Sequence, residues 1–209
     1  MFELNLTFFI IQAIAIISAI TVHEFAHAYT ADRLGDPTPR LMGRVTLNPL
    51  AHLDPIGTVL IFVFGFGWGK PVLFDPFNLA NPRKDSAIIS FAGPLSNIIL
   101  AIIFALIYHL LSFLGFSKYL DILQYPIFIN LILAFFNLIP VYPLDGYKIV
   151  EGLLPERQAI EWSELRRYGI IFLFLLVMPL FSNSSMATNL IFPIVRFIQN
   201  ILLAGNSII

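Results

Sequence analysis

Two histidines and a glutamate share one short motif, His23-Glu24-Phe25-Ala26-His27, inside a long apolar run. Residues four apart on a helix lie about 40° apart around the axis and about 6 Å along it, so both imidazoles can converge on one metal ion. Glu24 projects to the side, where it can take a proton from a metal-bound water. Polar residues that merely snorkel at a helix end do not explain this spacing. The motif therefore predicts a metal-dependent hydrolase.

A third metal ligand has to come from elsewhere in the chain, because a catalytic zinc takes three protein ligands and keeps one open position. Asp145 is the carboxylate that stands out, since two prolines precede it where an apolar run ends. That run, the third along the chain, ends on the same side of the membrane as the run that carries the two histidines. Asp145 can therefore lie at a depth similar to theirs. Asp145 is equally suited to cap a helix over residues 147–154. A pair of histidines with a carboxylate can also hold Fe, Co or Mn.

The elements that carry these residues are dictated by an apolar composition. Of the 209 residues, 58% are hydrophobic and 12% are charged, and the net charge of −1 gives no support for nucleic-acid binding. The absence of cysteine excludes disulfides and thiolate metal sites. About 20 apolar residues cross the hydrocarbon core of a bilayer as a helix. Runs of this kind cover residues 4–31, 86–115, 122–140, 168–181 and 187–204.

These runs predict an all-α polytopic membrane protein with about five transmembrane helices. Residues 58–74, between the first and second spans, are rich in β-branched and aromatic residues and then in alternating glycines. This pattern indicates a membrane-embedded, re-entrant β-hairpin. The edge of such a hairpin can pair with an extended substrate strand, or the hairpin can simply plug a cavity.

The distribution of basic residues predicts the orientation. Six Lys and Arg residues lie between the first and second spans and four between the third and fourth, whereas the opposite loops hold Lys118. Basic residues accumulate in cytoplasmic loops. We therefore expect both charged connections, and the metal motif beside the first of them, to face the cytosol.

Three motifs together resemble the site-2 protease family of intramembrane zinc metalloproteases. They are His23-Glu24-x-x-His27 in the first span, Gly93-Pro94-x-x-Asn97 in the second, and Asn137-x-x-Pro140 with Leu144-Asp145-Gly146 after the third. Residues 43–58 look like a small prokaryotic branch of this family. We expect neither a PDZ nor a CBS domain in the chain.

The resemblance implies a zinc-dependent intramembrane endopeptidase that takes part in regulated intramembrane proteolysis. It implies one Zn²⁺ per chain on His23, His27 and Asp145, with Glu24 as the general base. The resemblance covers about residues 15–155. From the apolar runs we expect a single protease domain over residues 1–209, with a catalytic core at about 4–155 and a C-terminal helical pair at about 166–205. The expected surroundings are the lipid bilayer of a prokaryotic cell and a transmembrane protein substrate.

Asn97, Asn137 and His52 are further candidates. A neutral amide can stabilise the oxyanion of the reaction or contact substrate, and the resemblance favours Asn137 for this role. Buried asparagine in a membrane helix is also common as a link between helices. His52 is a candidate gate or substrate contact, although a histidine in a surface loop often has no such role. A different function for the histidine and glutamate cluster is proton or metal passage in a transporter or channel.

Overall fold

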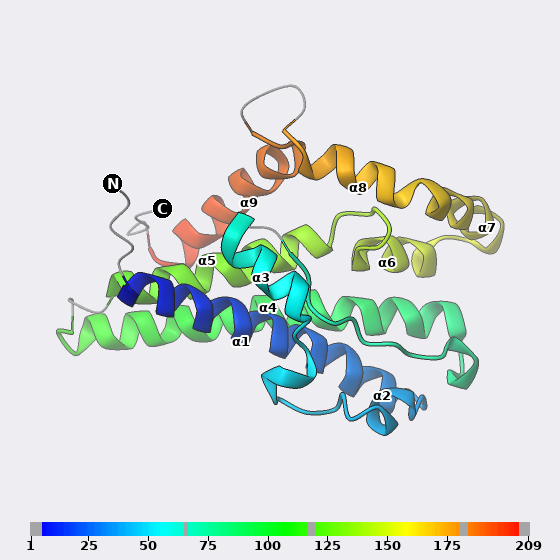
Figure 1. Ribbon diagram of the computed structural model, residues 1–209, viewed down its shortest axis with the longest axis horizontal. Coiled ribbons are helices and arrows are strands. Elements are labelled where there is room, and N and C mark those ends of the chain that lie inside the picture. Colours follow the sequence, from blue (N-terminus) through cyan, green and yellow to red (C-terminus); the bar gives the residue numbers. More distant parts are fainter. Residues whose placement is uncertain (1–5, 65–66, 117–119, 180–183, 205–209) are drawn as a thin grey trace.

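The computed structural model describes residues 6–64, 67–116, 120–179 and 184–204. Across these residues the regular structure is helical, and the β-type pairing is a single isolated bridge between Leu53 and Gly69. Figure 1 shows long helices running along the molecule, with some of the shorter helices toward one end and others near its middle. The predicted all-α class is confirmed for this part of the chain.

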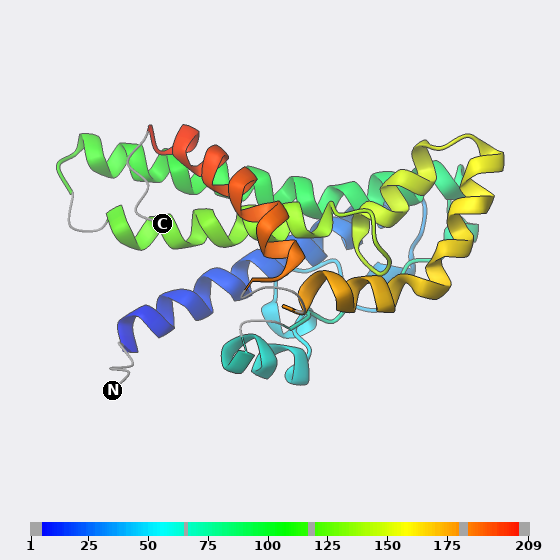
Figure 2. The same cartoon turned by 90° about the horizontal axis from the view of Figure 1, so that it is seen from above.

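Three helices are long and apolar enough to cross a membrane: α1 (Leu6–Arg33), α4 (Pro82–Phe113) and α5 (Leu120–Asn137). At 1.5 Å per residue they measure roughly 42, 48 and 27 Å. Both views place α4 and α5 side by side, and α1 packs against the pair (Figures 1 and 2). These helices correspond to the first three predicted spans.

Alanine lets these helices approach one another closely. Ala15 and Ala19 on α1, Ala101 and Ala105 on α4, and Ala134 on α5 are each at most 3% exposed. Lipid offers little hydrophobic driving force between helices, so close backbone approach at small residues contributes much of the association. The spacing of four residues keeps each alanine pair on one helix face.

The C-terminal part consists of α7 (Glu156–Glu164), η4 (Leu165–Tyr168), α8 (Gly169–Val177) and α9 (Met186–Leu202). With nine residues, α8 is roughly 13 Å long and too short to span a bilayer. Helix α9 packs on α5 through a buried face. The described residues thus contain three spanning candidates, and the prediction of about five is not confirmed. Residues 180 and 181 of the fourth predicted run lie outside the described residues.

The connection between α1 and α4 contains α2 (Thr38–Leu41), η1 (Pro49–Ala51), α3 (Pro55–Phe64) and η2 (Pro76–Asn78). The predicted β-hairpin over residues 58–74 is therefore wrong for 58–64, which are helical, while residues 65 and 66 lie outside the described part. Short apolar runs fit either structure by periodicity alone. The deciding signal is local, because the Asp54 carboxylate accepts a hydrogen bond from Gly57 N–H at 2.8 Å and Pro55 opens the helix.

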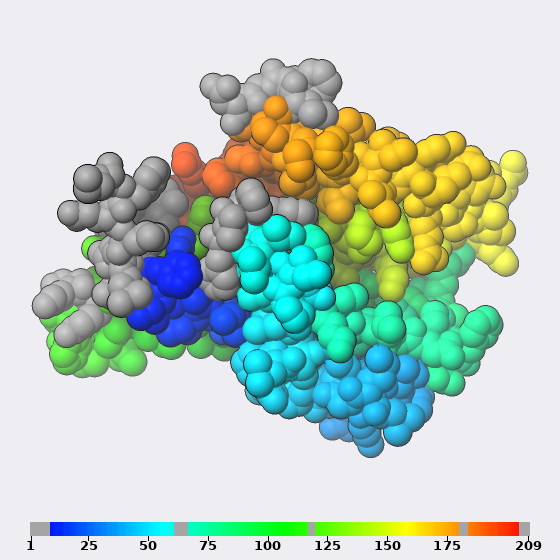
Figure 3. Space-filling model, viewed as in Figure 1, coloured from blue at the N-terminus to red at the C-terminus, as the bar shows by residue number. Residues whose placement is uncertain are grey.

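Helix α3 lies at the surface of the molecule. Ile56 is 68% exposed and Val59 is 60% exposed. In Figure 3 the segment, drawn in cyan, occupies the middle of the visible face between α1 and the α7–α8 region. The described part of this connection thus presents an exposed apolar helix where a strand edge was expected.

Asp36, three residues after α1, holds the later part of the α1–α4 connection close to the end of α1 by hydrogen bonds. Its carboxylate is fully buried and accepts hydrogen bonds from Asp75 N–H at 2.7 Å, Asn78 Nδ2 at 2.8 Å and the Thr38 hydroxyl at 2.6 Å. Burial raises the pKa of Asp36, but these donors outweigh it and hold the pKa below its ordinary value. The carboxylate is therefore ionised at neutral pH and joins α1 to η2.

Helix α6 (Asp145–Leu153) follows α5 after a short turn and packs against α4. A side chain at Gly146 would overlap the carbonyl oxygen of Leu138, and one at Gly152 would overlap the Ala87 side chain. These two glycines let α6 lie directly on the end of α5 and on α4. The close packing brings the first residue of α6 to the side of α1.

Candidate metal centre

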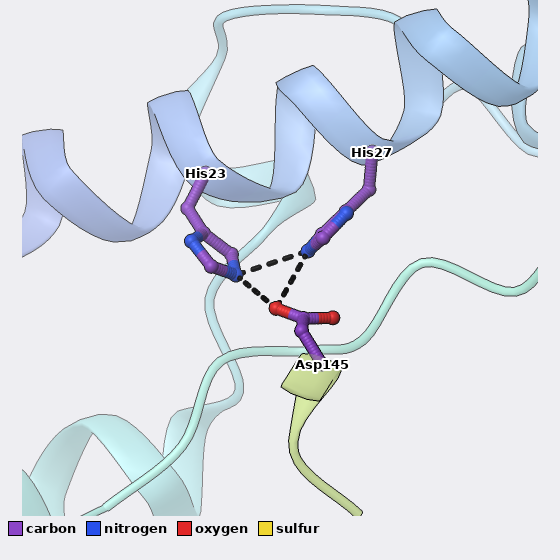
Figure 4. Close-up of side chains that lie close together, drawn as sticks. All are labelled: His23, His27 and Asp145. Carbon is purple, nitrogen blue, oxygen red and sulfur yellow. Dashed lines mark hydrogen bonds and ion pairs between the residues drawn. The ribbon is translucent and has the colours of Figure 1, made fainter. Parts of the chain in front are cut away.

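His23, His27 and Asp145 meet at one point in the structure. Figure 4 shows both imidazoles projecting from successive turns of α1 toward the Asp145 carboxylate at the start of α6. The Nε2 atoms of the two histidines are 3.0 Å apart, and Asp145 Oδ2 lies 3.1 Å from His23 Nε2 and 3.3 Å from His27 Nε2. The structure thus brings together the three predicted metal ligands.

One face of α4 supports both imidazoles. Ile89 and Asn97 are eight residues apart, so they lie on the same side of the helix two turns apart. The carbonyl oxygen of Ile89 accepts a hydrogen bond from His27 Nδ1 at 2.7 Å, and Asn97 Oδ1 lies 2.7 Å from His23 Nδ1. The two ring nitrogens that point away from the meeting point are therefore both engaged.

Gly93 lies midway between these two contacts and leaves room for the rings. A Cβ atom at this position would overlap His27 Nε2 and would lie 2.7 Å from His23 Cε1. Real Cβ atoms do not approach other heavy atoms so closely. The glycine of the Gly93-Pro94-x-x-Asn97 motif is thus required by space, because the imidazoles pack directly on the α4 backbone.

The side chain of Asp145 does not cap α6. The N-cap position is Leu144, no side-chain capping hydrogen bond is formed there, and Asp145 is the first helical residue. Its carboxylate points at the two imidazoles instead. The structure thus shows no capping hydrogen bond from Asp145 and places its carboxylate where a metal ligand would have to lie.

The donor set fits a divalent cation. Because a carbonyl oxygen can only accept, His27 Nδ1 carries a proton, and neutral His27 then presents the lone pair of Nε2 to the meeting point. Ligand atoms at 2.0–2.1 Å from a tetrahedral zinc ion lie about 3.3 Å from one another, close to the observed 3.0–3.3 Å. A bound cation would offset the repulsion between lone pairs held this close.

Glu24 contacts the connection between α1 and α4. Its Oε2 accepts a hydrogen bond from Val72 N–H at 3.0 Å and lies 4.0 Å from Arg44 Nη2. The carboxylate is mostly buried, with 14% of the side chain exposed. Extended chain from the connection therefore sets the orientation of this side chain.

Sequence reasoning did not single out Arg44. Its side chain is 4% exposed, and its guanidinium donates to the carbonyl oxygens of Ala51 and Lys70. It thereby links two separate parts of the connection beside Glu24. A lone basic residue in a loop carries no sequence signal for this role, which emerges only when the loop is folded.

The remaining candidates lie in different surroundings. His52 is fully buried, its Nε2 lies 2.7 Å from the Thr46 carbonyl oxygen, and burial lowers its pKa below the ordinary value. Within the described part of the chain, the hydrogen-bond partner of His52 is Thr46 rather than His23, His27 or Asp145. Asn137 is half-buried and donates to the Leu133 carbonyl oxygen at 2.9 Å.

Comparison with known proteins identifies the family. The model of peptidase family M50 matches residues 11–121 and 115–180. The chain is 45% identical over 175 residues to the "Putative zinc metalloprotease YwhC" of Bacillus subtilis, covering 80% of each protein. It is 27% identical over 189 residues to the "Putative zinc metalloprotease Rip2" of Mycolicibacterium smegmatis, covering 82% of this chain and 68% of the relative.

A further relative is archaeal. The chain is 31% identical over 143 residues to the "Putative zinc metalloprotease MJ0611" of Methanocaldococcus jannaschii, covering 68% of this chain and 70% of that protein. No solved structure matches the chain. The family match, the zinc metalloprotease relatives and the donor set agree, which favours a peptidase over the alternative of a transporter or channel. The chain belongs to peptidase family M50, the site-2 protease family, and is a zinc-dependent peptidase built into a membrane.

Proposed function

We propose that this protein is an intramembrane endopeptidase that hydrolyses peptide bonds of transmembrane protein substrates. The observation that carries the proposal is the convergence of His23, His27 and Asp145 at one end of a membrane-length helix, with Glu24 next to the first ligand. Ionisable residues in such a helix are costly and are retained for function. Because the site lies in a bundle of membrane-length helices, the peptide bonds nearest to it belong to transmembrane segments of other proteins.

His23, His27 and Asp145 would hold the zinc ion. Zinc at such a site supplies Lewis-acid chemistry, polarising a carbonyl and lowering the pKa of water from 15.7 to about 7. The protein fixes the two imidazoles from behind through α4 and brings the carboxylate from α6. The fourth position of the zinc ion would be left to water and substrate.

Glu24 is the general base of the proposed reaction. Its carboxylate takes a proton from the attacking water and then delivers it to the nitrogen of the leaving peptide, so one side chain acts as base and then as acid. The hydrogen bond from Val72 N–H holds one carboxylate oxygen and leaves the other for proton transfer. Asn137, eight residues before Asp145, is the neutral donor that we propose for the oxyanion.

The site opens to the cytosol in this proposal, and the membrane is that of a prokaryotic cell. Ten of the twelve Lys and Arg residues lie between the predicted first and second spans or between the predicted third and fourth spans, on the same side as His23 and His27. The positive-inside rule places these connections in the cytoplasm. Substrate therefore meets the zinc site near the cytoplasmic surface of the bilayer.

A comparison of wild type with Glu24→Gln tests the proposal. Both proteins are purified in detergent, assayed for zinc and incubated with a single-span model substrate. We expect equal zinc content, cleavage by wild type that a chelator blocks, and a rate at least about 10²- to 10⁴-fold lower for the variant. Glu161→Gln, on the exposed surface of α7, is the matched control and keeps full activity. Cleavage by Glu24→Gln at the wild-type rate contradicts the assigned base.

A further inference from the structure

Two buried asparagines connect three helices behind His23. Asn97 on α4 and Asn130 on α5 are both fully buried, and Asn97 Nδ2 lies 2.9 Å from Asn130 Oδ1. Asn97 Nδ2 also donates to the Ala19 carbonyl oxygen of α1 at 3.0 Å. Asn130 was not among the predicted site residues, although a polar residue in the middle of an apolar span is a signal for function.

The hydrogen bonds determine how both amides are oriented. Asn130 Nδ2 lies 2.9 Å from the carbonyl oxygen of Pro126, which can only accept, so the nitrogen of the Asn130 amide must be on that side. The Asn130 oxygen therefore faces Asn97 and accepts from its Nδ2. Both hydrogens of Asn97 Nδ2 are then used, one by Asn130 and one by Ala19.

The orientation of Asn97 determines the tautomer of His23. With both amide hydrogens engaged elsewhere, the Asn97 group that faces His23 Nδ1 at 2.7 Å is the oxygen, which can only accept. The proton of the neutral ring is therefore on Nδ1. The lone pair of Nε2 is directed at Asp145 and His27, as a metal ligand requires.

We propose that Asn97 and Asn130 form a relay that positions His23 for metal binding. Asn97 acts on the ring directly, and Asn130 acts through Asn97 by holding its amide in the accepting orientation. The inference rests on the proposed zinc site and adds two positioning residues to it. Partners that orient a metal-ligating histidine typically contribute about 10- to 100-fold to metal affinity.

Substitution of Asn97 separates this role from a link between helices. Zinc affinity is measured on purified protein in detergent by competition with a chromophoric chelator, which needs no peptidase activity. We expect Asn97→Leu to bind zinc about 10- to 100-fold more weakly than wild type. Asn97→Asp still accepts from His23 Nδ1 and stays closer to wild type than to Asn97→Leu.

If Asn97 only linked helices, the zinc affinities of these two variants would follow the opposite order. Asn97→Asp loses the same two donated hydrogen bonds as Asn97→Leu and adds a buried charge, so it would be at least as damaging. The matched control is Gln199→Leu, which removes another fully buried amide on α9, linked to α5 rather than to His23. Wild-type affinity in Asn97→Leu, or equal losses in both Asn97 variants, overturns the proposal.

Asn130 provides a second test that does not depend on how Asn97→Asp folds. We expect Asn130→Leu to weaken zinc binding by about tenfold, at the lower end of the range for orienting partners. The double variant Asn97→Leu with Asn130→Leu should bind zinc no more weakly than Asn97→Leu alone, because the two residues act in series. Losses that multiply show independent roles and contradict the relay.

A His23→Leu variant distinguishes failure of the relay from failure of the proposed metal site. If His23→Leu keeps zinc at wild-type affinity, the proposed ligand set is wrong and the relay falls with it. If His23→Leu loses zinc while the asparagine variants keep it, the zinc site stands and the relay alone is refuted.

Discussion

The two halves of the candidate site are held in different ways. The metal-ligand half consists of His23, His27 and Asp145, which extend from α1 and α6 and are supported from behind by α4. The carboxylate half consists of Glu24, which is oriented by irregular chain at Val72 and Arg44. Helix packing thus holds the proposed metal ligands, whereas the connection between α1 and α4 holds the proposed base. The difference implies that metal binding and turnover can be lost separately.

The largest effect is expected for Asp145→Ala, because it removes a ligand of the metal-ligand half. Zinc affinity should fall by more than the about 10- to 100-fold that an orienting partner contributes. The two imidazoles stay on α1, so the fold should persist. Zinc content of the purified variant, with circular dichroism to report helix content, gives the result. Full zinc content in a folded Asp145→Ala protein means that another residue is the third ligand.

The next largest effect is expected for Gly93→Ala, which leaves every ligand in place. The added Cβ overlaps His27 Nε2, so one or both imidazoles must move away from α4. We expect a loss of zinc affinity of about 10- to 100-fold and a lower melting temperature, since overpacking costs about 1–3 kcal/mol. Chelator competition and thermal unfolding measure the two quantities. If Gly93→Ala binds zinc as wild type does, the rings do not depend on contact with α4.

Arg44→Ala tests the other half of the comparison. Each lost hydrogen bond from the guanidinium to the Ala51 and Lys70 carbonyl oxygens costs about 1.5–3 kcal/mol. Because the connection then positions Glu24 less well, we expect kcat to fall about 10- to 100-fold. Zinc content should stay at the wild-type value. Arg44→Lys should recover only part of kcat, because one ammonium lacks the fork geometry that serves two acceptors.

Arg40→Ala is the matched control for Arg44. Arg40 is in the same connection, but 68% of its side chain is exposed, and it pairs with Asp32, whose side chain is 6% exposed. This pair is separate from the hydrogen bonds of Val72 and Arg44 beside Glu24, so kcat should be unchanged. Loss of zinc in Arg44→Ala would show that the two halves are not separable.

The smallest effect is expected for Asp36→Asn, which loosens the connection at its start. At neutral pH the free energy of unfolding should fall by about 1–3 kcal/mol, because buried donors lose an ionised acceptor. The pKa of Asp36 is lower in the folded protein than in the unfolded chain. Its contribution to stability is therefore present above the unfolded pKa of about 4 and is lost as the pH falls through the folded pKa.

Melting temperatures of chelator-treated wild type and Asp36→Asn, compared between pH 7 and pH 3, measure this pH dependence. The difference in melting temperature between the two proteins should narrow toward acid pH, because wild type then loses the stabilisation by the ionised Asp36 carboxylate, which the variant lacks at every pH. A gap that stays constant over this range means that the ionised carboxylate is not the stabilising group.

Local patterns determined a large part of this protein. The four-residue spacing of His23 and His27 and the three long apolar runs each depend on residues close together in the chain, so helical periodicity and the length of a bilayer were sufficient to predict them. The same local reasoning failed over residues 58–64, because a short apolar run has no unique period and the helix start at Asp54 was not recognised.

Tertiary structure alone decided which distant residues complete the site. Asp145 lies 122 residues from His23, and whether it capped a helix or met the imidazoles depended on how closely α6 packs on α4 and on the turn that follows α5. Asn130 and Arg44 acquired their contacts in the same way, from helix and loop packing over long sequence separations. Sequence spacing describes which side chains share one helix face, whereas contacts between elements depend on the shapes that those elements bury against one another.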